Sequence, residues 1–122
     1  EYVSNTNRAQ GNNQYMYNSK ERRLKEILQV GLPLGSLKAE DYKSDVYDFN
    51  SGDVMIFLSD GLPEATNVKG EMLGYEAVYD CMLDNIEQDP QTILDTLSNL
   101  GTNWIKGTQL DDDITLLVVR KN

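Results

Sequence analysis

Three consecutive aspartates, Asp111, Asp112 and Asp113, run directly into the apolar, β-branched segment ITLLVV. Their mutual repulsion is unfavourable unless a cation binds them or water solvates them in a turn. Another carboxylate, Asp60, follows the apolar run VMIFLS in the stretch FLSDG. If the two apolar runs are antiparallel neighbours in a sheet, these carboxylates converge at one edge. Such oxygen ligands suit Mg²⁺ or Mn²⁺, which can activate a water to attack a phosphoryl group.

Each motif also has an ordinary structural interpretation. Asp and Gly are common turn residues, so SDG alone is most often a turn. A run of aspartates alone is most often a solvated loop or an element boundary. The chain contains no histidine, which removes Ser-His-Asp and Cys-His catalysis and most zinc sites. Carboxylates with a hard cation are therefore the chemistry available to this sequence.

The composition is that of a single acidic globular domain. The chain has 122 residues, of which 39% are hydrophobic and 25% charged, as in ordinary globular domains. A formal net charge of −9 disfavours nucleic acid and anionic membranes, which select Lys and Arg. One cysteine forms no intrachain disulfide, and no apolar run is long enough to cross a bilayer. We therefore expect a cytoplasmic protein whose segment contacts neither nucleic acid nor membrane.

The apolar patterns predict several strands, then two helices, then a closing strand. The expected strands are 14–18, 24–30, 44–49, 54–59 and 113–121. Helical spacing marks 75–88 and 89–105, the second with Asp89 as N-cap and Pro90 at the first helical position. The buried stripe of that helix is expected to be Ile93, Leu94, Leu97 and Leu100. This order predicts an α+β fold with antiparallel strands and a helical layer on one face.

The order of the motifs is more specific than any one of them. GLPLG is followed by GDVMIFLSDGLPEATN, GEMLG, two helices and DDDITLLVVR. This pattern, from about Val30 to Lys121, resembles the C-terminal half of the PPM family of metal-dependent, type-2C-like serine/threonine phosphatases. The nearest branch is the bacterial SpoIIE/RsbU type. The resemblance implies antiparallel β-sheets in a sandwich flanked by helices, with residues 1–122 as the C-terminal part of the domain.

The resemblance implies roles for four residues. Asp60 and Asp112 would be metal ligands, Gly61 would allow the tight turn after Asp60, and Asp113 would support the site beside Asp112. No residue is assigned as a catalytic nucleophile. Family members also carry an earlier Asp-Gly motif that bridges both metals, and this sequence has no such motif. The segment VSNTNRAQGNN lies where members often show NAGHxPP.

The three consecutive aspartates Asp111–Asp113, here called the acidic run, lie where the family motif has only two. Their alignment with the motif is therefore open by one residue. Thr115 fits the family pattern DDxT and favours Asp112 as the ligand. Asp111 is then expected to be solvated and without a role.

The implied function is a protein serine/threonine phosphatase that hydrolyses phosphoserine or phosphothreonine with a metal-activated water. Mn²⁺ or Mg²⁺ would occupy a two-metal site in the complete domain. The implied partner is a phosphorylated STAS-type anti-anti-sigma protein, in a bacterial switch that regulates a sigma factor. The alternative is a non-catalytic phosphatase-like module for interaction or homodimerisation, since a partial domain need not be active alone. An Asp-Gly motif upstream in the parent chain would favour the phosphatase, and its absence would favour the non-catalytic module.

Overall fold

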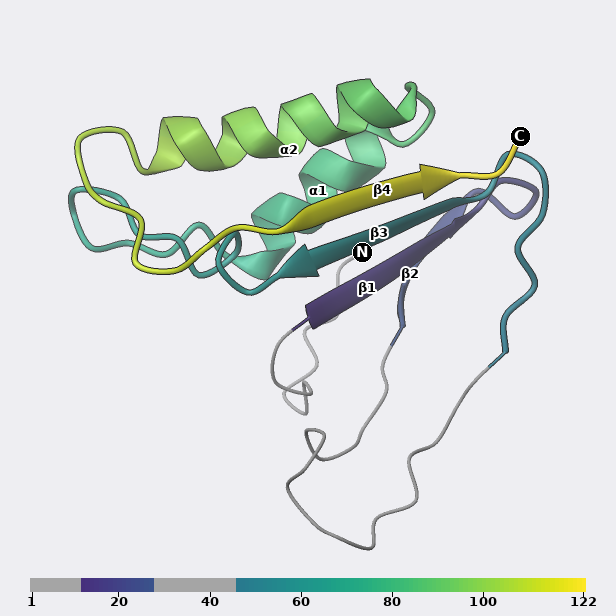
Figure 1. The fold of residues 1–122 in the computed structure, drawn as a ribbon, viewed down its shortest axis with the longest axis horizontal. Helices are drawn as coiled ribbons and strands as arrows, with labels where there is room; N and C mark the ends of the chain where they lie inside the picture. Colours follow the sequence, from purple (N-terminus) through teal and green to yellow (C-terminus); the bar gives the residue numbers. More distant parts are fainter. Residues whose placement is uncertain (1–11, 28–45) are drawn as a thin grey trace, which may run out of the picture.

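The computed structural model describes residues 12–27 and 46–122, which form one antiparallel sheet and two helices. The elements are β1 (Asn12–Asn18), β2 (Arg23–Ile27), β3 (Val54–Ser59), α1 (Tyr75–Asn85), α2 (Pro90–Trp104) and β4 (Leu116–Arg120). The strands lie in the order β2-β1-β3-β4, and both helices cover one face of the sheet (Figure 1). The predicted α+β fold is confirmed. The described residues supply one sheet of the expected sandwich.

β3 is an inner strand, paired with β1 on one side and with β4 on the other. Ile56 lies opposite Tyr15 of β1 on one side and opposite Val118 of β4 on the other. Its buried face, formed by Val54, Ile56 and Leu58, packs in the core beneath the helices. The two faces differ, because the alternate residues of β3 are only half-buried.

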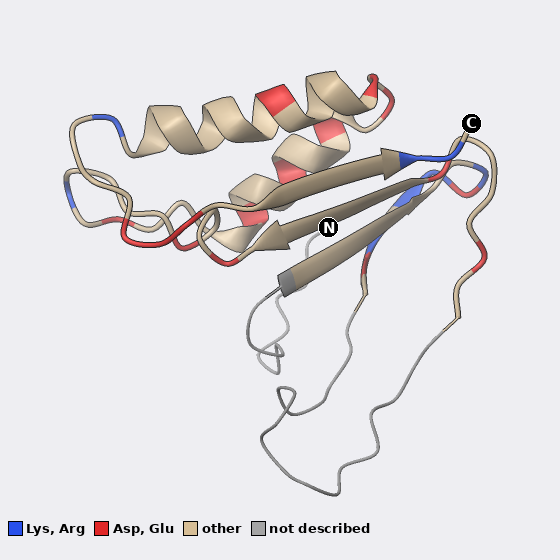
Figure 2. Ribbon diagram, viewed as in Figure 1, with Lys and Arg blue, Asp and Glu red and all other residues tan. Residues whose placement is uncertain are grey.

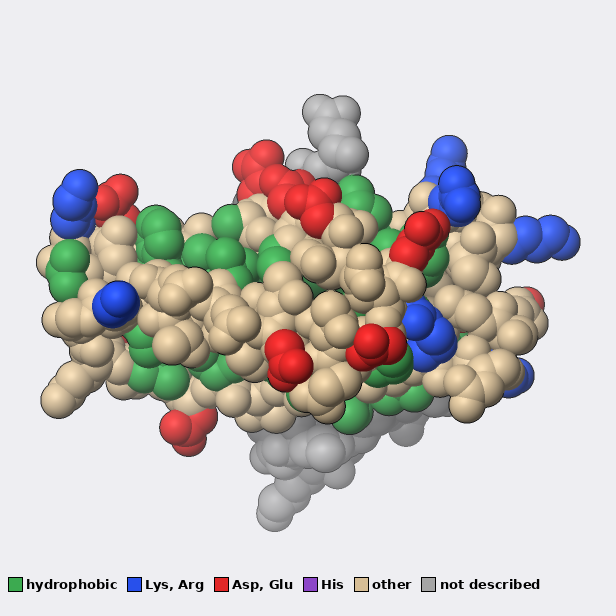
Figure 3. Space-filling model, turned by 90° about the horizontal axis from the view of Figure 1, so that it is seen from above, with side chains coloured by type: hydrophobic (Ala, Val, Ile, Leu, Met, Phe, Trp, Pro, Cys, Tyr) green, Lys and Arg blue, Asp and Glu red, His purple; other side chains and the backbone are tan. Residues whose placement is uncertain are grey.

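Local sequence sets the start of α2. The Asp89 side chain accepts a hydrogen bond from the backbone N–H of Thr92 at 2.8 Å, and Pro90 occupies the first turn, as predicted. Ile93 and Leu97 are buried against the sheet, whereas the flanking leucines of the predicted stripe are half-buried. The outer side of α2 is largely uncharged (Figure 3). Burial and the N-cap therefore stabilise this helix, with little help from ion pairs.

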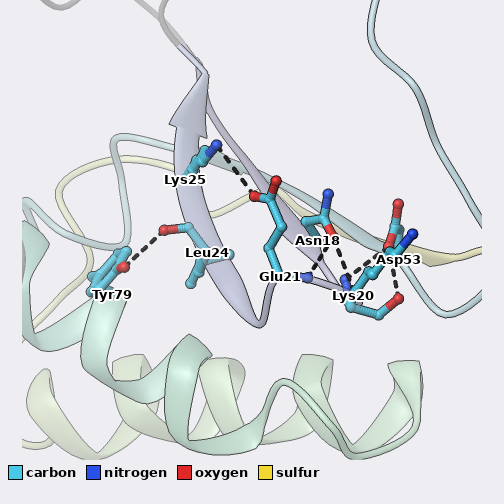
Figure 4. A network of polar contacts seen from close by, with 8 residues as sticks. Asn18, Lys20, Glu21, Leu24, Lys25, Asp53 and Tyr79 are labelled. Carbon is cyan, nitrogen blue, oxygen red and sulfur yellow. Dashed lines mark hydrogen bonds and ion pairs between the residues drawn. The ribbon is translucent and has the colours of Figure 1, made fainter.

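A buried carboxylate ties the sheet together at the end where β3 begins. Asp53 belongs to the network of polar contacts in Figure 4. Its Oδ1 accepts hydrogen bonds from the Ser19 backbone N–H at 2.8 Å and the Ser19 hydroxyl at 2.9 Å. Its Oδ2 accepts the Asn50 N–H at 2.9 Å. Burial raises the pKa of Asp53, but these hydrogen bonds and the charge of Lys121 outweigh burial and hold the pKa below its ordinary value. The turn between β1 and β2 is thereby joined to the start of β3.

Two segments differ from the sequence-based expectations. Residues 46–50 form no strand, although 44–49 was predicted as one. The reason is that Val46 is 96% exposed, so the apolar alternation there does not reflect a buried face. The closing strand begins at Leu116 and not at Asp113, because the acidic run bends before pairing starts. The GLPLG motif and residues 28–30 of the predicted second strand lie outside the described residues.

The face of the sheet turned away from the helices is apolar and accessible. Leu117 is 53% exposed and Val119 is 39% exposed. In the register of the sheet they lie opposite Phe57 and Met55 of β3, which are half-buried. We call this surface, formed by Met55, Phe57, Leu117 and Val119, the outer face. None of the described helices is long and apolar enough to span a membrane.

Candidate metal site

The two acidic motifs lie at the same end of the sheet. β3 ends at Ser59 and β4 begins at Leu116, and the strands are antiparallel neighbours, with Leu58 opposite Leu116. The acidic residues that follow β3 and precede β4 gather at this end (Figure 2). The pairing expected from the sequence therefore brings Asp60 and the acidic run to one edge.

Ser59 connects the acidic run to the end of β3 through hydrogen bonds. Its backbone N–H donates to the carbonyl oxygen of Thr115 at 3.0 Å, and its hydroxyl accepts the Thr115 N–H at 2.9 Å. The same hydroxyl donates to the carbonyl oxygen of Asp113 at 3.1 Å. These bonds continue the β3–β4 ladder beyond the strands and fix the backbone that follows Asp112. Sequence reasoning did not assign this role to Ser59.

Gly61 allows the two segments to touch. A Cβ atom built at Gly61 would overlap the carbonyl oxygen of Asp113 and lie 2.9 Å from its carbonyl carbon. It would also lie 3.3 Å from the carbonyl oxygen of Asp112. Gly61 is not among the glycines with positive φ. The position thus requires glycine for close approach of the backbone, and not for a left-handed conformation.

Asp60 is half-buried and held by two donors from other elements. The Nδ2 of Asn13 donates to Asp60 Oδ1 at 2.6 Å, and the Tyr75 hydroxyl donates to the same oxygen at 2.9 Å. None of the described residues donates to Oδ2 of Asp60. Within the described part of the chain, Oδ1 thus accepts two hydrogen bonds and Oδ2 accepts none.

The three aspartates of the run are exposed, and the side chains of Asp111 and Asp112 accept hydrogen bonds from different donors. The Asp112 Oδ1 accepts the backbone N–H of Asp113 at 2.8 Å. The Asp111 Oδ2 accepts the Thr66 hydroxyl at 3.2 Å, so Asp111 contacts the loop after β3 and is not merely solvated. The Asp111 and Asp112 carboxylates therefore have different hydrogen-bond donors.

The donors fit part of a site for a hard divalent cation. Asp60 and Asp112 offer carboxylate oxygens, which Mg²⁺ and Mn²⁺ prefer, and Mg²⁺ usually keeps several waters when carboxylates bind it. Within residues 12–27 and 46–122, no group of three His, Cys, Asp or Glu side chains could hold a metal ion together. These residues thus offer Asp60 and Asp112 as candidate carboxylate ligands, and a complete site needs further ligands.

Comparison with known sequences identifies the family. A sequence profile of the family described as Stage II sporulation protein E (SpoIIE) matches residues 7–122. The chain belongs to the SpoIIE family. It is also similar to the phosphoserine phosphatase RsbU of Bacillus subtilis (strain 168), with 26% identity over 110 residues and 88% of this chain covered. The SpoIIE/RsbU-type resemblance of the motifs is confirmed.

Two solved structures show the same fold. The SiaA-PP2C domain of Pseudomonas aeruginosa matches 93% of this chain with a TM-score of 0.73 and 18% identity. The structure of the PP2C phosphatase domain and a fragment of the regulatory domain of SpoIIE from Bacillus subtilis matches 93% with a TM-score of 0.64 and 22% identity. The SpoIIE-family chain therefore has a PP2C-type fold.

The matched relatives are much longer than this chain. The chain spans 31% of the length of RsbU, 44% of the SiaA chain and 32% of the SpoIIE chain.

Proposed function

We propose that Asp60 and Asp112 are metal ligands in the active site of a protein serine/threonine phosphatase, of which residues 1–122 form the C-terminal part of the catalytic domain. The observation that carries the proposal is the packing of the acidic run against the SDG turn. Ser59 holds the backbone of Asp113, and Gly61 leaves room for it. Membership of the SpoIIE family and the PP2C-type fold support the same class of reaction.

Each residue of this edge has a distinct task in the proposed site. Mn²⁺ or Mg²⁺, when bound, supplies an activated water for attack on the phosphorus of a phosphoserine or phosphothreonine. Asp60 and Asp112 orient the ion through their carboxylate oxygens. Asp113 supports Asp112 by donating its N–H to the Asp112 carboxylate and by anchoring the backbone on Ser59. The remaining ligands of a two-metal site would come from the rest of the domain.

The proposed substrate is a phosphoprotein. The relative RsbU is named a phosphoserine phosphatase, which supports a phosphorylated STAS-type anti-anti-sigma protein as the partner in a bacterial partner switch in the cytoplasm. The net charge of −9 disfavours a nucleic-acid ligand and suits a partner with basic residues around its phosphorylated side chain.

Titration of the chain with Mn²⁺ tests the ligand assignment. Asp60→Asn and Asp112→Asn should each weaken Mn²⁺ binding about tenfold or more, because each removes a charged ligand. Asp111→Asn should bind Mn²⁺ like the wild type, since its carboxylate contacts Thr66. Asp95→Asn on the exposed side of α2 is the matched control for loss of a surface charge.

The same variants decide whether the chain catalyses hydrolysis. Any Mn²⁺-dependent hydrolysis of a generic phosphate ester should disappear in Asp60→Asn and persist in Asp95→Asn. Equal loss of Mn²⁺ binding in Asp60→Asn, Asp111→Asn and Asp112→Asn would contradict the choice of Asp112.

The alternative function, a phosphatase-like interaction or dimerisation module, is favoured by the outer face. Leu117 and Val119 expose apolar surface there of the kind that association buries. If a second copy covers it, the chain should dimerise in light scattering after size exclusion, and Leu117→Lys should yield monomers. A monomeric wild-type chain would contradict the dimer.

A further inference from the structure

Resting on the metal-ligand role proposed for Asp60, we infer that Asn13 and Tyr75 are positioning residues that hold its carboxylate in one orientation. The Asn13 Nδ2 and the Tyr75 hydroxyl both donate to Asp60 Oδ1, at 2.6 Å and 2.9 Å. The three residues come from β1, from the turn after β3 and from the first position of α1. Three separate elements of the fold thus meet at one carboxylate oxygen.

Asn13 occupies a position where an apolar residue would be ordinary. Its side chain is 5% exposed, and along β1 it alternates onto the same buried face as Tyr15 and Tyr17. A buried amide is unfavourable unless it is hydrogen-bonded. Because a carboxylate only accepts hydrogen bonds, the NH₂ side of the amide must face Asp60. Hydrogen bonds to charged acceptors are shorter than those between neutral groups, which agrees in direction with the short Asn13–Asp60 contact.

The Tyr75 hydroxyl has a single proton to donate and two carboxylates nearby. It lies 2.9 Å from Asp60 Oδ1 and 3.4 Å from Glu64 Oε1. The shorter contact identifies Asp60 as the principal acceptor. The tyrosine ring is fixed at the start of α1, so its hydroxyl approaches Asp60 from the helical layer, whereas Asn13 approaches from the sheet.

Two donors on one oxygen restrict both torsion angles of a short side chain. An unrestrained aspartate samples several staggered rotamers, and binding a cation then requires ordering one of them. In this arrangement the Asp60 side chain is already ordered before a cation binds. None of the described residues donates to its Oδ2. Ligands held in this way bind more tightly because less freedom is lost on binding.

The test combines Mn²⁺ affinity with the order of the Asp60 side chain in the metal-free chain. Free Mn²⁺ is measured by electron paramagnetic resonance, and order by NMR relaxation of the Asp60 carboxyl carbon. Asn13→Leu fills the same space without a donor, and Tyr75→Phe removes only the hydroxyl. Tyr79→Phe is the matched control, since it removes a hydroxyl that donates to the carbonyl oxygen of Leu24 at 2.8 Å.

Asn13→Leu and Tyr75→Phe should each weaken Mn²⁺ binding about tenfold, the effect of losing one hydrogen bond to a charged group. The Asp60 carboxyl carbon should become more mobile in both, while Tyr79→Phe resembles the wild type in both measurements. A role in packing alone would leave Asn13→Leu at wild-type affinity.

The outcomes separate this inference from the proposed function. Wild-type affinity in both variants, with binding lost in Asp60→Asn, overturns the positioning role and leaves the proposed ligand intact. An unchanged Asp60 carbon signal in both variants also overturns it. If Asp60→Asn binds Mn²⁺ like the wild type, or the wild type binds none, the proposed ligand role is wrong and this inference is wrong with it.

Discussion

Gly61 and Asp113 are in such close contact that a single added methyl group at Gly61 would overlap the Asp113 carbonyl oxygen. The contact joins the turn that follows β3 to the segment that precedes β4. Any change in the size of residue 61 therefore displaces the carboxylates that we assign to the metal site.

Gly61→Ala should destabilise the fold by about 1–3 kcal/mol, because the methyl group meets backbone that cannot shift alone. It should also weaken Mn²⁺ binding. Urea denaturation measures the first effect and Mn²⁺ titration the second. Gly101→Ala is the control, since its methyl group meets the ends of the Leu62 and Ile114 side chains and not the backbone of another segment. Equal effects at both positions would show that the Gly61 contact is not special.

Leu97→Ala should lower the free energy of unfolding by about 2–5 kcal/mol, because it leaves a cavity where a fully buried side chain packed. Leu83→Ala on the exposed side of α1 should cost only about 0.5 kcal/mol. Both are measured by urea unfolding, followed by the fluorescence of Trp104, the only tryptophan of the chain. A small loss for Leu97→Ala would mean that α2 does not pack on the sheet as described.

Asp53→Asn should destabilise the protein at neutral pH by about 1–3 kcal/mol, since it weakens a buried network of hydrogen bonds. The pKa of Asp53 in the folded chain lies below the ordinary value of 3.8, so near that pH the unfolded chain binds more protons than the folded one. The stabilisation by Asp53 is therefore fully present above 3.8 and is lost as the pH falls through the lower folded value.

Unfolding free energies of the wild type and Asp53→Asn, measured from pH 7 down to pH 2.5, check this dependence. The difference between the two proteins should shrink as the solution becomes more acidic than the ordinary aspartate pKa. Asp84→Asn, an exposed residue of α1, controls for the general effect of charge. A difference that stays constant across the range would mean that the charge of Asp53 does not stabilise the fold.

Local sequence patterns predicted the helices and strands that are determined by interactions between neighbouring residues. Asp89 and Pro90 predicted the start of α2, and the apolar run 54–59 predicted β3. The convergence of Asp60 and the acidic run was also predictable, because it needed only one assumption, that their strands pair antiparallel. The structure confirms that pairing.

Contacts between distant polar residues were not predictable from a single sequence. Asn13 and Asp60 are 47 positions apart, and Asn13 belongs to a polar stretch that gives no sign of a buried strand position. The roles of Ser59 and Tyr75 likewise depend on the register of β3 and β4 and on where α1 begins. The alternation in residues 46–49 predicted a strand that is not formed. In the described structure, these residues pack no buried face against the core.

The pairing of β4 with β3 has a consequence for how the site opens. Thr115 and Ser59 are 56 positions apart, and β4 is an edge strand of the described sheet. Edge strands detach in local fluctuations that cost less than complete unfolding, and detachment of β4 would separate Asp112 from Asp60 in one event. The lifetime of the assembled site is then set by the local stability of β4, and amide hydrogen exchange along Leu116–Arg120 would report it.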